Sequence, residues 1–175
     1  MEIGHSERRH IFRETDEEER AKVLKAVQLG LYPLLCVGET ARQKELGIAD
    51  EVLSIQLKVG AGALTGRQAQ HLIAAYEPVW AIGTQGIPAD PSYVRQRHLH
   101  LRKVLTDLFG PRVGGDIPIL FGGSVNPGNA AAYIGLPHVN GLFVGRSAWK
   151  KGGYMDLVRQ CLPIYQEKLS AKEVD

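Results

Sequence analysis

The chain has 175 residues, 44% of them hydrophobic, and its 21 basic and 19 acidic residues leave a formal net charge of +2. This length suits one globular domain with a buried core, and the balanced charge gives no indication of a nucleic-acid or membrane partner. Cys36 and Cys161 stand far apart with no metal-ligand spacing, so neither a disulfide framework nor a metal site is expected. No apolar stretch approaches the roughly 20 residues of a membrane span, and the charged amino terminus is unlike a signal peptide. We expect a cytoplasmic protein with a small-molecule partner.

The first predicted helix follows a capping box, in which Thr15 is the cap and Glu18 lies three residues later. Apolar residues then recur at helical spacing until Gly30, which favours a helix end. The continuous apolar run 31–37 comes directly afterwards and ends at Gly38. A short run of this kind is typical of a strand that is buried on both faces, as in a parallel sheet.

The same alternation continues to the end of the chain. Helices are predicted near 50–59, 91–109, 128–134 and 154–169, and strands near 72–76, 117–121 and 142–144. Residues 2–3 look like the stub of one further strand. The pattern predicts an α/β fold with a parallel sheet, made of about four complete βα units plus that stub. An open doubly wound sheet and an arc of a barrel both fit it. His98 and His100 are expected on the surface of their helix, not as a metal pair.

The residues with chemical potential follow the strands, where α/β folds place their sites. Glu77 leaves an apolar strand and enters an apolar loop, and burial there would raise the pKa of its carboxyl group. The alternative is a strand-end glutamate that caps a helix or pairs with an arginine. The loop 78–84 favours the first interpretation, because a rigid proline and flanking glycines suit a hinged lid that excludes water.

Two glycine-rich turns follow consecutive strands, at 122–124 and at Gly145. Glycines let backbone N–H groups approach an anion, and barrels commonly bind phosphate between their last two loops. One such turn alone is more often only a tight turn; two together favour phosphate. His5 by itself carries little signal, because a lone histidine near a terminus is more often a surface or packing residue.

Three segments, 3–9 (IGHSERR), 75–84 (AYEPVWAIGT) and 122–125 (GGSV), resemble triose-phosphate isomerases in order and spacing, over essentially the whole chain. The resemblance implies a TIM barrel that interconverts dihydroxyacetone phosphate and D-glyceraldehyde 3-phosphate, in glycolysis and gluconeogenesis, without cofactor or metal. It implies that Glu77 is the base, that His5 polarises the carbonyl and that Glu7 supports the site. The implied phosphate-binding residues are Gly83, Ser124, Phe143, Gly145 and Arg146. The implied lid is Pro78, Val79, Trp80, Ala81, Ile82, Gly83 and Thr84.

The chain also departs from that family. The family's first three strands, with their substrate-binding Asn and Lys, have no counterpart, so we expect residues 1–175 to form a single incomplete barrel domain, truncated at its amino end, with impaired catalysis. Open sheet edges favour a homo-oligomer that completes or covers the barrel. Residues 145–149 (GRSAW) resemble relatives that act on four-carbon ketose phosphates. An isomerase of erythrulose phosphate therefore remains an alternative, and so does a catalytically silent fragment or phosphate-binding oligomer.

Overall fold

A computed structural model of the chain describes residues 1–83 and 86–172. Its centre is one sheet of five strands in the order β1-β2-β3-β4-β5, and each neighbouring pair is parallel. The strands are β1 (Glu2–Ile3), β2 (Leu34–Val37), β3 (Ile73–Tyr76), β4 (Ile119–Phe121) and β5 (Gly141–Leu142). This arrangement confirms the predicted α/β fold of the partial TIM-barrel type.

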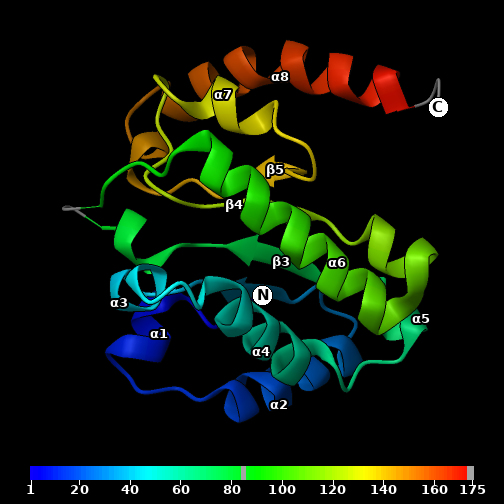
Figure 1. Cartoon of the computed structure of the whole chain (residues 1–175). Coiled ribbons are helices and arrows are strands. Elements are labelled where there is room, and N and C mark those ends of the chain that lie inside the picture. Colours follow the sequence, from blue (N-terminus) through cyan, green and yellow to red (C-terminus); the bar gives the residue numbers. More distant parts are fainter. Residues whose placement is uncertain (84–85, 173–175) are drawn as a thin grey trace.

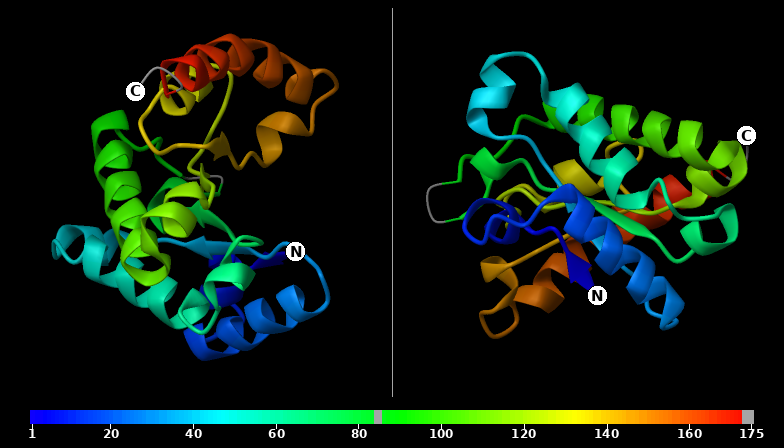
Figure 2. Two further views of the ribbon diagram at one scale, coloured as in Figure 1. Left: turned by 90° about the vertical axis from the view of Figure 1, so that its right-hand side faces the viewer. Right: turned by 90° about the horizontal axis from the view of Figure 1, so that it is seen from below.

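Helices connect the strands and lie around the outside of the sheet (Figures 1 and 2). They are α1 (Ser6–His10), α2 (Asp16–Gln28), α3 (Ala41–Glu45), α4 (Ala49–Ala61), α5 (Gly66–Ala69), α6 (Pro91–Asp116), α7 (Ala130–Ile134) and α8 (Gly153–Lys172). Five of the helices contact one another in chain order, from α2 to α4, α6, α7 and α8. The sheet and the helices outside it therefore form an arc, with the blue amino-terminal segment at one end and the red α8 at the other (Figure 1). In the described part of the chain, no helix is both long and apolar enough to cross a membrane.

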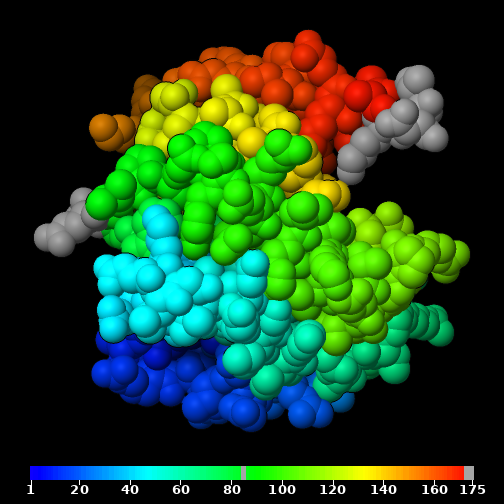
Figure 3. Space-filling view, in the orientation of Figure 1, coloured from blue at the N-terminus to red at the C-terminus, as the bar shows by residue number. Residues whose placement is uncertain are grey.

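The core fills the space between the strands and the helices. Its fully buried side chains include Leu35 on β2, Leu57 on α4, Leu105 on α6 and Ile119 on β4. In the space-filling view, successive segments of the chain lie in contact with one another from the blue amino-terminal end to the red carboxyl-terminal end (Figure 3). Burial of both faces of the short strands explains why they appear in the sequence as continuous apolar runs.

The predicted capping box is present at the start of α2. The Thr15 side chain accepts the Glu18 backbone N–H at 3.3 Å, and the Glu18 carboxylate accepts the Thr15 N–H at 2.8 Å. Two short helices that the sequence analysis did not predict, α3 and α5, begin with the same device at Thr40 and Thr65. A cap satisfies the first free N–H groups of a helix, which is enough for one or two turns that are too short to show an apolar period.

The surface position expected for His98 is wrong, because this side chain is fully buried. It lies on the α6 stripe of Val94, Leu101 and Leu105, which faces the core. Its Nδ1 lies 3.1 Å from the His138 carbonyl oxygen, and its ring meets those of Tyr76 and Phe121 edge-on. Burial lowers the pKa of His98 to about 3, so the ring is a neutral part of the core.

The ammonium group of Lys168 on α8 joins that helix to α7. It donates to the carbonyl oxygens of Ile134 at 3.1 Å and Val139 at 2.6 Å, and also to that of Leu136. We expect Lys168→Met to lower the free energy of unfolding by about 2–3 kcal/mol, because charge-assisted bonds to these carbonyls are lost. Urea denaturation measures the loss. The exposed Lys103, which pairs with Asp107 at 2.8 Å, gives the control, and Lys103→Met should cost less than about 0.5 kcal/mol.

Candidate active site

The parallel strands bring Glu77 and His5 to the same edge of the sheet. Glu77 follows β3 directly, and His5 follows β1 after one glycine. The carboxyl ends of parallel strands lie together, so residues 72 positions apart in the sequence become neighbours. The distance from His5 Nε2 to Glu77 Oε1 is 3.7 Å. Two of the predicted site residues are thus brought into one cluster.

His5 is held by the start of α1. Its Nδ1 accepts the backbone N–H of Glu7 at 3.3 Å, so the ring acts as the side-chain cap of this helix. A ring nitrogen that accepts carries no proton, which places the proton of the neutral ring on Nε2. Nε2 is the nitrogen that faces Glu77. Glu7, which the resemblance implies as a support residue, contacts His5 through its backbone N–H, and the residue is exposed at the surface.

The Glu77 carboxyl group is nearly buried, with 6% of its side chain exposed. Its Oε2 has no hydrogen-bond partner among the described residues. Burial raises its pKa to about 7, although His5 and the Cys36 thiol act in the opposite direction. A carboxyl group with a pKa near neutrality is a better proton acceptor than an exposed glutamate and is still ionised in part at pH 7. Glu77 therefore has the character of a general base.

The loop after Glu77 starts as a fixed structure. Pro78 is buried and leads into a 3₁₀ turn, η1 (Val79–Ala81). The indole Nε1 of Trp80 donates to Glu39 Oε1 at 2.8 Å, and the hydroxyl groups of Tyr76 and Tyr93 donate to the same carboxylate at 3.0–3.2 Å. Glu39 is completely buried. No role for Glu39 was expected from the sequence, although an acidic residue just after a buried strand at this edge of the sheet was an available signal.

Trp80→Phe should lower the free energy of unfolding by about 1–3 kcal/mol, because it removes one donor from a buried carboxylate. Guanidinium chloride denaturation followed by circular dichroism measures the change. The chain supplies a matched control in Trp149, which is 78% exposed. Trp149→Phe should change stability by less than about 0.5 kcal/mol. Equal effects of the two substitutions would show that the bond to Glu39 contributes nothing.

The other predicted phosphate-loop residues contact the later part of this loop. Ser124, which follows β4, donates its hydroxyl to the Ala81 carbonyl oxygen at 2.7 Å. Arg146, which begins the 3₁₀ turn η2 (Arg146–Ala148) after β5, donates to the Gly83 carbonyl oxygen at 2.5 Å. Gly145 is the cap of that turn. The proposed lid and the proposed phosphate loops therefore adjoin; Thr84, the last predicted lid residue, lies outside the described residues.

Phe143 is half-buried behind these loops. Its backbone N–H donates to the Phe121 carbonyl oxygen at 2.8 Å, which extends the pairing of β4 and β5 by one residue. Its side chain packs so closely on Gly122 that a Cβ atom there would lie 3.2 Å from it and equally far from Glu77 Cγ. The turn at Gly122 thus lies against both Glu77 and Phe143.

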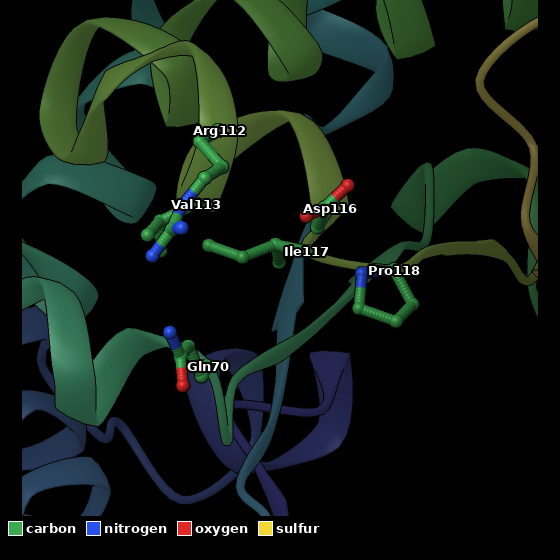
Figure 4. A pocket seen from close by; sticks show the side chains of 6 residues that line it. All are labelled: Gln70, Arg112, Val113, Asp116, Ile117 and Pro118. Carbon is green, nitrogen blue, oxygen red and sulfur yellow. The ribbon is translucent and has the colours of Figure 1, made fainter.

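Two hollows differ in their relation to this cluster. A small one is lined by Gly4, Ser6, Arg9, Cys36, Val37, Gly38, Glu77 and Val79. The larger one, of about 260 Å³, is lined by Gln70, Arg112, Val113, Asp116, Ile117 and Pro118 (Figure 4). These residues precede β3 and β4, so this pocket lies at the amino ends of the strands, opposite Glu77. We assign the candidate active site to the smaller hollow, because the buried Glu77 carboxyl group lines it. The described residues include no group of three or more side chains that could hold a metal ion.

Residues 1–161 match the family model described as Triosephosphate isomerase. The chain belongs to the triosephosphate isomerase family. Among curated relatives it is 48% identical to an L-erythrulose-1-phosphate isomerase of Rhizobium rhizogenes, over 92% of this chain and 60% of the relative. It is 48% identical to the protein of that name from Rhizobium meliloti, over 91% and 62%. With the one from Brucella abortus it shares 46%, over 92% and 62%. The chain thus spans about 60% of the length of these relatives.

These relatives correct the activity expected from the sequence. The expected interconversion of dihydroxyacetone phosphate and glyceraldehyde 3-phosphate, with its place in glycolysis and gluconeogenesis, is contradicted by relatives named for a four-carbon ketose phosphate. The expectation rested on the motifs around Glu77 and His5, and these motifs do not specify how many carbons the sugar has. The alternative interpretation, suggested by residues 145–149, agrees with these names.

Proposed function

We propose that this protein is an isomerase of a four-carbon ketose phosphate, with L-erythrulose 1-phosphate as its substrate. The observation that carries the proposal is the buried Glu77 carboxylate, 3.7 Å from the Nε2 atom of His5. The names of the relatives support the substrate. A phosphorylated sugar is also consistent with the family to which the chain belongs.

The chemistry of this substrate defines where the protons move. Its ketone is on C2, between C1, which carries the phosphate ester, and C3, which carries a free hydroxyl group. An enediol can form only between C2 and C3, because the oxygen on C1 is esterified. Glu77 takes the proton from C3 and returns it to C2, while His5 passes a proton from the C3 oxygen to the C2 oxygen. The carbonyl moves from C2 to C3 with no change in oxidation state, so the reaction requires no cofactor.

The phosphate group is proposed to bind at the turns after β4 and β5. Ser124 and Gly145 would offer backbone N–H groups there, Gly83 would offer one from the adjoining loop after β3, and Arg146 would offer a cation. The Phe143 N–H is already donated to the Phe121 carbonyl oxygen, so Phe143 would contribute through the packing of its side chain on Gly122. The segment 78–84 is proposed as the lid over the reacting carbons. The substrate would then be held by its phosphate group at the turns and by its carbonyl group at His5, which keeps the reacting carbons in a reactive position.

Turnover of L-erythrulose 1-phosphate, compared in the parent chain and a Glu77→Asp variant, tests the proposal. Shortening the side chain moves the carboxylate by about 1 Å, which should lower the rate at least about 100-fold. The exposed Glu45 provides a control, since Glu45→Asp should leave the rate unchanged. Turnover that does not depend on Glu77 would refute the mechanism. Phosphate binding without turnover would instead indicate a catalytically silent phosphate-binding module.

We further propose that residues 1–175 form one incomplete barrel domain that associates with another copy of itself. In the described residues, β1 and β5 each pair on one side only, so each leaves a strand edge open. Unpaired edges favour association with another strand. Sedimentation at micromolar concentration should give a mass of at least two chains, and a stable monomer would contradict this proposal.

The cytoplasm is the compartment we propose, because both cysteines are free thiols.

A further inference from the structure

The side chain of Arg9 lies beneath the ends of two strands. Arg9 belongs to α1, and only 9% of its side chain is exposed. Its Nε donates to the Gly4 carbonyl oxygen at 2.9 Å, and its Nη2 donates to the Cys36 carbonyl oxygen at 3.0 Å. Gly4 follows β1, and Cys36 lies in β2. One guanidinium group therefore connects two neighbouring strands at the edge that carries His5 and Glu77.

Two carboxylates from the first turns of α2 complete the surroundings of this guanidinium. Asp16 Oδ1 accepts from Nη1 at 2.5 Å, and Glu19 forms an ion pair with Nη2. Glu19 is completely buried. A buried carboxylate is costly unless it is paired, and an arginine with five donors in a planar fork can serve four partners at once.

The Glu19 carboxylate also lies directly against Gly4. A Cβ atom on Gly4 would lie 2.7 Å from Glu19 Oε2, and Gly4 has a φ of +76°, so only glycine fits this position. Gly4 is the residue before His5. Its backbone is thus held by Arg9 through its carbonyl oxygen and by Glu19 through close packing. On the other side, the Cys36 thiol contacts the Glu77 carboxyl group.

We propose that the buried Arg9–Glu19 ion pair is a positioning unit that fixes the His5 ring relative to Glu77. The unit touches neither His5 nor the Glu77 carboxylate, and it acts through the backbone of Gly4 and Cys36. It sets the direction of the His5 Nε2–H bond by holding the segment from which α1 begins. The effect of this unit on catalysis rests on the function proposed above for His5.

The test uses the full chain labelled with ¹⁵N in its histidine rings. In the parent chain, NMR should show His5 as one tautomer, with a protonated Nε2 and an unprotonated Nδ1. A double variant, Arg9→Met with Glu19→Leu, removes both charges together, so neither remains buried without its partner. We expect loss of the single-tautomer signature, with the two ring nitrogen shifts moving toward each other. We also expect kcat to fall at least about tenfold, with KM changed less than about twofold.

Arg8 supplies a matched control on the same helix. Its side chain is 49% exposed and pairs with Glu14 at 3.3 Å. Arg8→Gln should leave the His5 signature unchanged. An unchanged signature in the folded double variant would overturn the proposal. If the double variant does not fold, Arg9→Lys decides: a single ammonium cannot hold both carbonyl oxygens and both carboxylates, so the signature should change, and an unaltered one would overturn the proposal.

The two readouts separate this inference from the proposed function. The NMR signature requires no turnover. A parent chain without activity whose His5 tautomer depends on Arg9 would refute the function and retain the positioning unit. Turnover that depends on Glu77, together with a His5 NMR signature that does not change when Arg9 is substituted, would refute the positioning unit alone.

Discussion

At pH 8, the Glu77→Gln variant should be more stable than the parent chain and should have no isomerase activity. Burial raises the pKa of Glu77 to about 7 in the folded chain, against an ordinary value of 4.5. Between these two values the folded state binds more protons than the unfolded state, so the stability of the parent chain falls as the pH rises. Above pH 7 the ionised carboxylate costs about 3 kcal/mol. A glutamine has nearly the same shape and carries no charge.

The pH dependence distinguishes this effect from a general change in packing. The advantage of Glu77→Gln should shrink as the pH falls and should be less than about 1 kcal/mol at pH 5. Thermal and urea denaturation at pH 5 and pH 8 measure it. Glu45→Gln, which changes an exposed carboxylate, should show no such difference between the two pH values. A variant that is equally or less stable than the parent at pH 8 would contradict the assigned ionisation.

Gly38→Ala should destabilise the chain by more than about 3 kcal/mol, or prevent it from folding. Gly38 follows β2, and its backbone passes so close to β3 that an added Cβ atom would lie 1.9 Å from the Glu77 carbonyl oxygen. That distance is far below van der Waals contact. The added atom would meet the backbone of Glu77 and Pro78 and not a flexible side chain, so the two segments cannot separate without breaking the hydrogen bond from the Glu77 N–H to the Val37 carbonyl oxygen.

Gly66→Ala is the matched control for this substitution. A Cβ atom on Gly66 meets no atom within 4 Å, and this residue lies in the first turn of α5. Alanine is favourable in a helix, so the control should be neutral or slightly stabilising. Chemical denaturation of both variants gives the comparison. A Gly38→Ala chain with the stability of the parent would show that the two strands do not approach as closely as described.

Local signals in the sequence were sufficient for most of the fold. The Thr15–Glu18 capping box and the apolar runs are formed by residues close together in the chain, and each predicted strand was found. The positions of strand starts were less accurate: β2 begins at Leu34 and not at residue 31, because Leu31 and Tyr32 are exposed ahead of the sheet. Hydrophobicity alone does not show which apolar residues precede the first ladder hydrogen bond.

The parts of the site that could not be predicted depend on contacts between distant segments. Glu39 receives bonds from Tyr76, Trp80 and Tyr93, which lie 37 to 54 positions further along the chain. Arg9 likewise contacts the residue after one strand, a residue within the next strand and a second helix. No pattern within a short window shows that these groups meet. The position of Glu77 after an apolar strand and before an apolar loop indicated its role, whereas His5 was assigned only from the resemblance to triose-phosphate isomerases.

The strand order also bears on how the chain folds. Every strand of the described sheet pairs with the strand that follows it in the sequence, and no pairing skips a strand. Each addition to the sheet therefore closes only the connection between consecutive strands, and because the closure entropy grows slowly with loop length, the entropic cost of each step stays similar. During synthesis the layers can accumulate from the amino end as each βα unit leaves the ribosome. The Glu77–His5 cluster can then form once β3 has joined, before the phosphate loops exist.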